Sequence, residues 1–508
     1  MNNPHGMAIG FGATTDSHHA VGNERSKRLT AHAALMRQAD EIWSRLRDLI
    51  EQIARSDPTY GAIGDSADPC PPEGVSEAIP AGGTLVLLHP FEPGIACFVL
   101  RSAEDAAGRF TTLTTSIARL PADNWVTKAE TDGVEMVDAL ADRMLRPLTS
   151  GDPAAGKVME LLLSRLSRVL YPALAPGLPP MDRDEPPNLI LVPSGALCGL
   201  PLHALPWPGG NVRLLDGYAV SYISSTDALV SLVRRPSVPA GMAVVAPAIS
   251  GSPGHSESPA ALAEASAIAA AADVSPLLRR DATVASLLDR PDTASLRWVH
   301  LVTHAVASGG GRAGSGLSGL LLYDEHGAEG VWLTAQEIWA RLPLDGVEHL
   351  AISSCSTHID DRPPGDRMAG LLRAFLYRGV RSVQATLWPV LDVAAALVDT
   401  WTWEALLAGE VNKARALRAA VLRLRTCSGP KAGAELQRIA SSLPDGDPAR
   451  PAVDAMATEL QSLRQPFART TDWAPFVLHG APLVAPVQTE TSRVPAGLPR
   501  EDADGDHR

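Results

Sequence analysis

Two residues with reactive side chains, His304 and Cys355, each lie near the end of a short apolar run. His304 belongs to WVHLVTHA. Cys355 belongs to HLAISSCS, about 50 residues further along the chain. A neutral thiol is a weak nucleophile, and a neighbouring imidazole stabilises the thiolate and later protonates the leaving amine. The pair therefore predicts nucleophilic cleavage of an acyl bond.

The two apolar runs predict the elements that must bring this pair together. Short apolar runs bounded by turn signals are typical of strands buried in a parallel sheet. In an open α/β sheet, the carboxyl ends of such strands meet along one edge, where the chemistry is found. We therefore expect His304 and Cys355 to converge at that edge. The alternative for each residue is a structural role, as a buried thiol or an interior imidazole, and the neighbouring sequence must decide.

The pair belongs to a series of motifs that extends from residue 186 to residue 483. Each motif alone is weak, whereas eight collinear motifs form a specific pattern. The segments are LILVPSGALCGLPLHAL (189–205), SYISSTDALVSL (221–232), VVAPA with the Ala-rich helix that carries Glu264, WVHLVTHA, SGLLLYD with GVWLTAQEIW (318–339), AISSCSTH, MAGLLRAFLYRGVRSVQATLWPVLD (368–392) and TDWAPFVLHG (471–480).

This series resembles the CHAT family, caspase-like cysteine peptidases of the same clan as caspases and separases. The resemblance implies an α/β fold in which helices flank a caspase-like, mostly parallel sheet. It also implies two caspase-like lobes, an inactive N-terminal lobe and an active C-terminal lobe. The expected organisation is a disordered N-terminus (1–24), an N-terminal helical and inactive caspase-like region (25–180), a CHAT peptidase domain (181–485) and a disordered tail (486–508).

Local patterns predict several elements before the peptidase domain. Apolar residues at spacings of three and four predict a helix over 23–56. TLVLLHPF and IACFVLRS (84–91 and 95–102) predict a hairpin, and helices interrupted near two prolines are expected between 131 and 174.

The resemblance implies that His304 and Cys355 form a catalytic dyad. The backbone amides of Ala305 and Cys355 are then the implied donors to the oxyanion. The chain departs from the family pattern at two positions, because His358 stands where the family has a small residue and Ala305 stands where a glycine often follows the histidine. Ala305 can still supply its amide if its backbone needs no positive φ.

The strand after the post-nucleophile helix is implied to run beside the substrate peptide, and it corresponds to SVQATLW (382–388). Alternation along that strand places Gln384 and Thr386 on one side. Asp366 and Asp392 flank the groove by sequence, and a buried carboxylate there would select a basic side chain before the cut. The alternative is that both aspartates are charges on surface loops.

The composition excludes several other classes of protein. The 508-residue chain has a formal net charge of −13, which argues against nucleic acid as a partner. No segment resembles a signal peptide, and no apolar run approaches the ~20 residues that span a bilayer, so we expect a cytoplasmic protein without membrane contacts. Five widely spaced cysteines argue against disulfides or a zinc site. We expect no metal and no cofactor.

The combined expectation is a cytosolic cysteine endopeptidase that cleaves one or few protein substrates. The resemblance implies activation by a protein partner in bacterial antiviral defence or programmed cell death, with a gasdermin-like pore former as a candidate substrate. The glycine- and serine-rich segment 308–318 beside His304 is expected to become ordered on activation. The alternative is a catalytically idle CHAT scaffold, although the presence of both His304 and Cys355 favours a peptidase.

Overall fold

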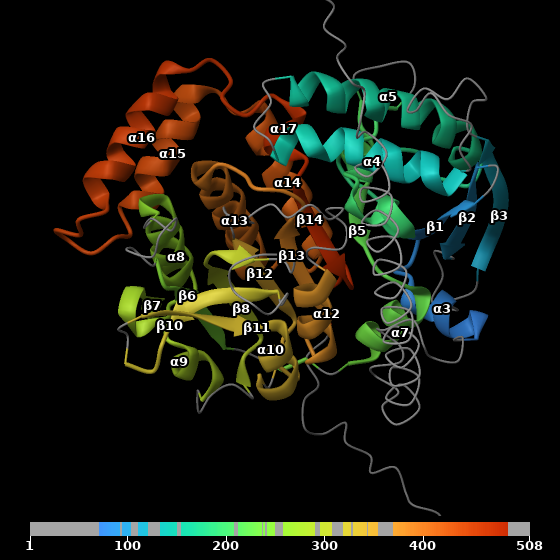
Figure 1. Ribbon diagram of the computed structural model, residues 1–508. Helices are drawn as coiled ribbons and strands as arrows, with labels where there is room; N and C mark the ends of the chain where they lie inside the picture. Colours follow the sequence, from blue (N-terminus) through green and yellow to red (C-terminus); the bar gives the residue numbers. More distant parts are fainter. Residues whose placement is uncertain are drawn as a thin grey trace, which may run out of the picture. The chain divides into compact units, whose positions relative to one another are not determined.

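An eleven-stranded sheet runs through the part of the chain that the computed structural model describes (Figure 1). The described residues are 71–485, except 92–93, 103–109, 120–132, 150–153, 208–211, 236, 239–240, 249–257, 290–294, 307–317, 327–328, 343 and 354–368.

The strands of this sheet come from both halves of the described region. In order across the sheet they are β3 (Phe110–Arg119), β2 (Gly94–Ser102), β1 (Thr84–Phe91), β4 (Asn188–Pro193), β5 (Ala219–Tyr222), β14 (Phe476–Gly480), β13 (Ser382–Thr386), β12 (His349–Ser353), β8 (Trp298–Val302), β6 (Met242–Ala246) and β7 (Leu277–Leu278).

Most neighbouring strands of the sheet are parallel. The antiparallel pairs are β3–β2, β2–β1 and β13–β14. Parallel strands are normally covered on both faces, so both faces must carry residues that tolerate burial. Every residue of β4, β12 and β13 is buried, as this rule requires. The mostly parallel sheet with flanking helices confirms the predicted α/β fold.

Helices cover both faces of the sheet. In the view of Figure 1, α4, α5, α13 and α14 lie above the strands, whereas α7 and α12 lie below them. The helices are α3 (Pro72–Ala78), α4 (Gly133–Thr149), α5 (Ala155–Leu174), α6 (Leu214–Gly217), α7 (Thr226–Arg234), α8 (Pro259–Ala271), α9 (Val284–Leu288), α10 (Ala335–Arg341), α12 (Ala369–Tyr377), α13 (Asp392–Leu407), α14 (Lys413–Thr426), α15 (Gly429–Ala440), α16 (Arg450–Ser462) and α17 (Thr470–Trp473).

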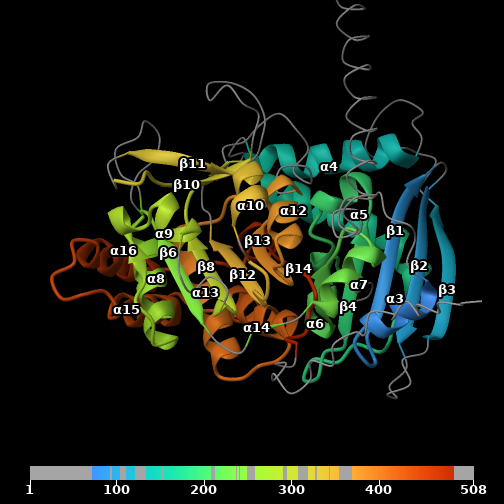
Figure 2. The same ribbon diagram turned by 90° about the horizontal axis from the view of Figure 1, so that it is seen from below.

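A second sheet of three strands begins just after β8. Its strands are β9 (Ala305–Val306), β10 (Gly319–Tyr323) and β11 (Gly330–Thr334), and both pairings are antiparallel. Figure 2 shows β10 and β11 side by side next to α10. The chain therefore passes from one sheet to the other through Thr303 and His304.

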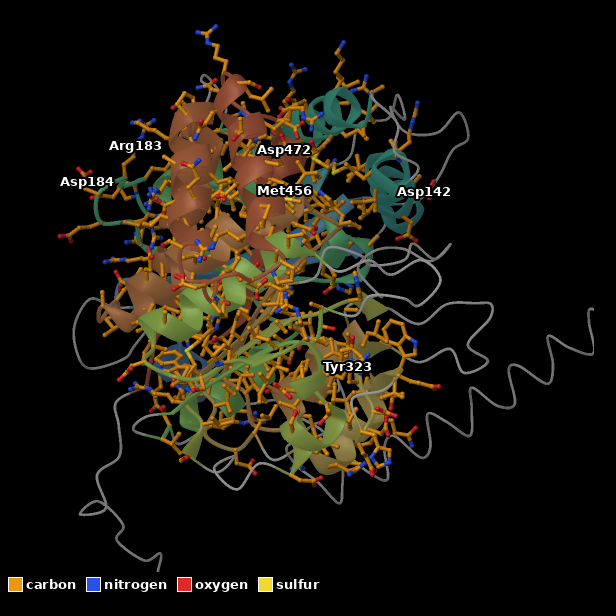
Figure 3. All side chains as sticks on the ribbon, turned by 90° about the vertical axis from the view of Figure 1, so that its left-hand side faces the viewer. Asp142, Arg183, Asp184, Tyr323, Met456 and Asp472 are labelled. Carbon is orange, nitrogen blue, oxygen red and sulfur yellow. The ribbon has the colours of Figure 1, made fainter. Side chains whose placement is uncertain are left out.

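The strands on the two sides of the large sheet share one hydrophobic core. Val86 of β1 and Leu191 of β4 belong to the same buried cluster as Leu397 of α13 and Trp473 of α17. Many charged side chains lie at the surface, and Figure 3 shows Asp142, Arg183 and Asp184 there.

The local elements expected before the peptidase domain agree with the structure where it describes them. β1 and β2 form the predicted hairpin, and α4 and α5 are helices within 131–174, although Pro147, where the sequence predicts an interruption, lies inside α4. The helix expected over 23–56, the N-terminus 1–24 and the tail 486–508 lie outside the described residues. No described helix is long and apolar enough to cross a membrane.

The expected domain boundary at residue 180 falls inside one continuous sheet. β1 pairs in parallel with β4, so the strands before the boundary extend the sheet formed by those after it. The inactive character of the first lobe stays a prediction.

Candidate active site

His304 lies at the carboxyl end of β8, at the junction of the two sheets. The backbone N–H of Leu321 in β10 donates to the carbonyl of His304 at 2.9 Å. One residue earlier, the N–H of Thr303 donates to the carbonyl of Ser353 at 3.1 Å, which extends the contact with β12 beyond the strand itself. The side chain of His304 is half-buried. Its backbone is therefore held on two sides while its imidazole remains accessible.

The register of β8 and β12 aligns the two predicted catalytic positions. Val302 lies opposite Ser353 in this parallel pair. His304 follows Val302 by two residues, and Cys355 follows Ser353 by two residues. Neighbouring strands in a sheet are about 4.8 Å apart. Cys355 itself lies outside the described residues, but the strand that leads to it ends beside the strand that leads to His304.

Ala305, one of the two predicted oxyanion donors, occupies the first position of β9. It pairs with Leu320 of β10 and is 1% exposed. Ala305 is not among the described residues with positive φ, so the replacement of glycine causes no backbone strain there. The role of its amide stays a prediction.

The predicted substrate-binding residues occupy different environments. Gln384 is 2% exposed and its amide donates to Asp399 of α13, so its side chain lies in the interior. Thr386, the last residue of β13, is also buried. Asp392 is the half-exposed first residue of α13, whereas Asp366 lies outside the described residues.

The expected pairing of a peptide along β13 is incompatible with the sheet topology. β13 lies between β12 and β14 and pairs with both, so its backbone has no open edge. The open backbone begins only after the strand. Leu387 donates to the carbonyl of Pro475, whereas the N–H groups of Trp388 and Val390 have no hydrogen-bond partner in the described part of the chain.

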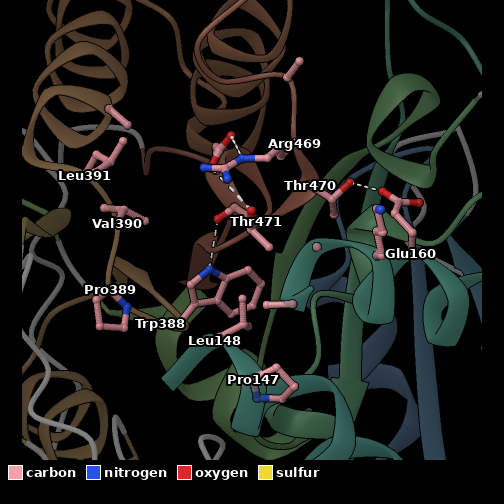
Figure 4. A pocket seen from close by; sticks show the side chains of 16 residues that line it. Pro147, Leu148, Glu160, Trp388, Pro389, Val390, Leu391, Arg469, Thr470 and Thr471 are labelled. Atoms are coloured by element: carbon pink, nitrogen blue, oxygen red, sulfur yellow. Dashed lines mark hydrogen bonds and ion pairs between the residues drawn. The ribbon is translucent and has the colours of Figure 1, made fainter. Parts of the chain in front are cut away.

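A cavity of about 960 Å³ lies beside this segment (Figure 4). The indole N–H of Trp388 donates to the carbonyl of Thr471 at 3.1 Å and fixes the ring at the cavity wall. Because β13 is parallel to β12, this cavity lies at the carboxyl edge of the sheet that also carries His304. The lining residues are Pro147, Leu148, Ala155, Gly156, Lys157, Glu160, Trp388, Pro389, Val390, Leu391, Ala394, Ala468, Arg469, Thr470, Thr471 and Asp472.

Most charges of this cavity are already paired. Arg469 binds Asp472 at 3.0 Å. Glu160 forms an ion pair with Arg213 at 2.9 Å and accepts a hydrogen bond from the hydroxyl of Thr470. The sequence does not predict that α4, α5 and α17 line this cavity, because no local pattern connects residues 147–160 with residues 468–472.

A buried polar cluster lies beneath the strand ends. Glu264 of α8 accepts from Nε2 of His300 at 2.8 Å and from the hydroxyl of Ser353 at 3.1 Å. Asp399 of α13 accepts a hydrogen bond from the side-chain amide of Gln384, and its carboxyl group interacts electrostatically with Glu264. Burial raises the pKa of Glu264 to about 8, and burial together with the charge of Glu264 raises that of Asp399 to about 8. The sequence pointed to Glu264 as part of a motif, but it carried no signal for Asp399.

Two other cysteines that the structure describes have the character of inert thiols. Burial raises the pKa of Cys97 to about 11 and also raises the pKa of Cys427. The thiol of Cys198 donates to the carbonyl of Pro193 at 3.2 Å. Among the described residues, no group of His, Cys, Asp and Glu side chains is arranged to hold a metal ion.

Comparison with known proteins identifies the family of the chain. No curated protein matches the chain significantly. Among solved structures, the Arg-specific cysteine proteinase gingipain R is similar at 10% identity and a TM-score of 0.37, over 69% of this chain and 74% of that one. The CHAT domain model matches residues 160–481. Because this match covers more than half of the chain, the protein belongs to the CHAT-domain family.

Proposed function

We propose that this protein is a cysteine endopeptidase whose nucleophile is Cys355 and whose acid–base residue is His304. The observation that supports this most directly is the register of β8 and β12, in which Val302 lies opposite Ser353. His304 follows Val302 by two residues, and Cys355 follows Ser353 by the same number. The raised pKa values of Cys97 and Cys427 make those thiols poor nucleophiles by comparison.

In the proposed reaction, the thiolate of Cys355 attacks the carbonyl carbon of the scissile peptide bond. The amides of Ala305 and Cys355 donate to the oxygen that becomes negatively charged. His304 then gives its proton to the leaving amine as the tetrahedral intermediate collapses to a thioester. Water, deprotonated by His304, hydrolyses the thioester and releases the thiol and the acid product.

The substrate residues before the cut would lie along Trp388–Leu391 and reach the cavity of Figure 4. The unpartnered N–H groups of Trp388 and Val390 can pair with an extended peptide. This placement replaces the expected pairing with β13, whose two edges are occupied.

The reactivity of Cys355 tests the assignment without knowledge of the substrate. We expect iodoacetamide to alkylate Cys355 faster than Cys97, Cys198 or Cys427 at neutral pH, as followed by peptide mass spectrometry. His304→Ala should slow only the alkylation of Cys355. Cleavage of a peptide library should disappear in Cys355→Ala and persist in the control Cys198→Ala. Cleavage by Cys355→Ala, or no effect of His304→Ala on its alkylation, contradicts the assignment.

The biological setting that we propose is a cytoplasmic enzyme with one or few protein substrates and an activating protein partner. Bacterial antiviral defence or programmed cell death, with a gasdermin-like substrate, fits the family. Segment 308–318 is rich in Gly and Ser, and ordering it costs roughly 1–2 kcal/mol per residue. The products of neighbouring genes should therefore accelerate cleavage by the purified protein, and equal rates with and without them would contradict activation by a partner.

A further inference from the structure

Two acidic side chains that the proposed reaction does not use lie side by side under the end of β12. Glu264 comes from α8 and Asp399 from α13, and they are 1% and 3% exposed. Their partners His300 and Gln384 flank Ala351 in register on neighbouring strands, so the two carboxyl groups lie close together. No Lys or Arg side chain in the described part of the chain forms an ion pair with either one. Two adjacent buried carboxylates without a cation repel each other, so one of them must hold a proton.

The donors around Glu264 identify it as the ionised partner. The indole N–H of Trp403 donates to Nδ1 of His300 at 3.0 Å, so the hydrogen of the neutral imidazole must be on Nε2. Nε2 then donates to one oxygen of Glu264 at 2.8 Å. The hydroxyl of Ser353 lies 3.1 Å from the other oxygen. Both oxygens of Glu264 therefore act as acceptors.

The environment of Asp399 is that of a protonated acid. One oxygen accepts from the amide of Gln384. The second oxygen can carry the proton and donate it toward the neighbouring carboxylate of Glu264. Burial raises the pKa of both carboxyl groups to about 8, which agrees with a proton held by the pair, and the hydrogen-bond donors around Glu264 place that proton on Asp399.

The remaining groups near the pair do not change this assignment. His300 on β8 is neutral, because burial lowers its pKa to about 4. Asp392 on α13 is a further acidic group that acts on Glu264 from a greater distance and favours protonation of the pair. β6, which also packs on α8, contributes only apolar side chains.

We propose that Glu264 and Asp399 form a carboxyl pair that shares one proton and holds Ser353, the last residue before the loop of Cys355, in position beside β8. Both are positioning residues, and the inference rests on the proposed peptidase function of that loop. Glu264 binds β8 through His300 and β12 through Ser353, so it connects the two strands whose ends carry the dyad. Loss of the shared proton would place two negative charges against each other beside Ser353, the last described residue of β12.

Two substitutions of similar size at Asp399 separate the role of the proton from that of packing. Asp399→Asn keeps an acceptor for Gln384 and an N–H donor for Glu264, so it imitates the protonated acid permanently. Asp399→Leu fills similar space but offers neither. We expect library cleavage and Cys355 alkylation by Asp399→Asn to stay within about twofold of wild type at pH 7, and those of Asp399→Leu to fall on the order of tenfold or more, because displacement of catalytic groups is costly.

The pH dependence gives a readout that packing alone would not change. Wild-type activity should decline as the pH rises through about 8, where the pair loses its proton, and Asp399→Asn should lack this decline. At pH values between the usual pKa of an aspartate and about 8, the folded protein holds a proton on Asp399 that the unfolded chain has released. The equilibrium constant for folding therefore falls by up to tenfold for each unit of rising pH. Asp399→Asn should reduce the slope of folding stability against pH by the contribution of one proton.

Infrared spectroscopy tests the pair independently of catalysis. Wild type at pH 7 should show the carbonyl band of a buried protonated carboxylic acid, and this band should be missing from Asp399→Asn and persist in Cys355→Ala. Absence of the band from wild type, or equal damage by Asp399→Asn and Asp399→Leu, overturns the inference. If the band is present but Cys355 is unreactive, the peptidase proposal fails and the proton-sharing pair stands.

Discussion

The indole N–H of Trp403 lies 3.0 Å from Nδ1 of His300, and the two rings are tilted by 79°. Both residues are fully buried, so no water competes for this hydrogen bond. Because the indole can only donate, it leaves His300 a single neutral tautomer, with hydrogen on Nε2. A residue of α13 thereby determines which hydrogen bond β8 can offer to Glu264.

Replacement of Trp403 should weaken both folding and the link between β8 and α8. Trp403→Phe leaves Nδ1 of His300 buried without a donor, which costs about 1–3 kcal/mol in free energy of unfolding. Urea denaturation at pH 7 measures this cost. Trp401→Phe, on the same helix, is the control. It removes the hydrogen bond from Trp401 to Glu435, but Glu435 keeps its hydrogen bonds from Arg438. A larger loss for Trp401→Phe would contradict the importance of the His300 contact.

The amino end of β12 depends on a buried ionic cluster around Glu348. This carboxylate binds Lys413, Arg381 and the backbone N–H of Ala485. Glu348→Gln leaves two cationic groups without their anion and should destabilise folding by about 3–5 kcal/mol. The double variant Glu348→Gln/Lys413→Met should recover part of this loss, and chemical denaturation of the two variants measures the difference. Strictly additive losses would show that the two residues do not interact.

Two glycines with nearly the same positive φ separate torsional strain from steric overlap. Gly480 and Gly409 have φ values of +104° and +106°. A Cβ on Gly480 would lie 2.4 Å from the carbonyl oxygen of Arg381, whereas a Cβ on Gly409 would meet nothing within 4 Å. Gly409→Ala should cost about 1–2 kcal/mol through φ alone. Gly480→Ala should cost about 1–3 kcal/mol more, as measured by thermal and urea unfolding, and equal costs would refute the overlap.

Acidification should destabilise the fold through buried neutral histidines. Burial lowers the pKa of His203 to about 3 and that of His300 to about 4, and it holds the pKa of His349 well below its usual value. Below about pH 6.5 the unfolded chain binds protons that the folded protein cannot, so the histidine contribution to stability falls as the pH falls, by up to about 1.4 kcal/mol per pH unit for each histidine. The three histidines together outweigh the opposite contribution of the single proton held by Asp399. Denaturation between pH 7 and 5 measures the slope. His203→Gln should reduce it by one proton, and an unchanged slope would exclude His203 from this effect.

Selection of a basic side chain before the cut remains the prediction for substrate preference. Asp392 is half-exposed at the start of α13, next to the cavity residue Leu391. A carboxylate that pairs with Lys or Arg there would discriminate against neutral and acidic side chains. Mapping of cleavage sites in a peptide library by mass spectrometry tests this preference. Asp392→Ala should weaken it, with Asp366→Ala as the comparison, and a consensus of Asp or apolar residues would exclude the acidic pocket.

The sequence by itself determined the two strands that carry the candidate dyad. The runs that contain His304 and Cys355 are apolar, short and bounded by polar segments, and such runs form buried parallel strands whatever their partners are. The hairpin of β1 and β2 could be predicted for the same reason, because the residues that form it are adjacent in the chain.

Tertiary structure alone decided which surfaces these strands share. The alternation of Gln384 and Thr386 could be predicted from the chain. The presence of β14 along the second edge of β13 could not, because β14 comes from residues ninety or more positions later. Asp399 and Glu264 are likewise far apart in the sequence, and only the packing of α13 on α8 joins their carboxyl groups. Local composition can specify a strand or a helix, because the relevant contacts lie within a few residues. The partner across a sheet or a helix interface depends on the packing of the whole core, and a single sequence carries no local signal for it.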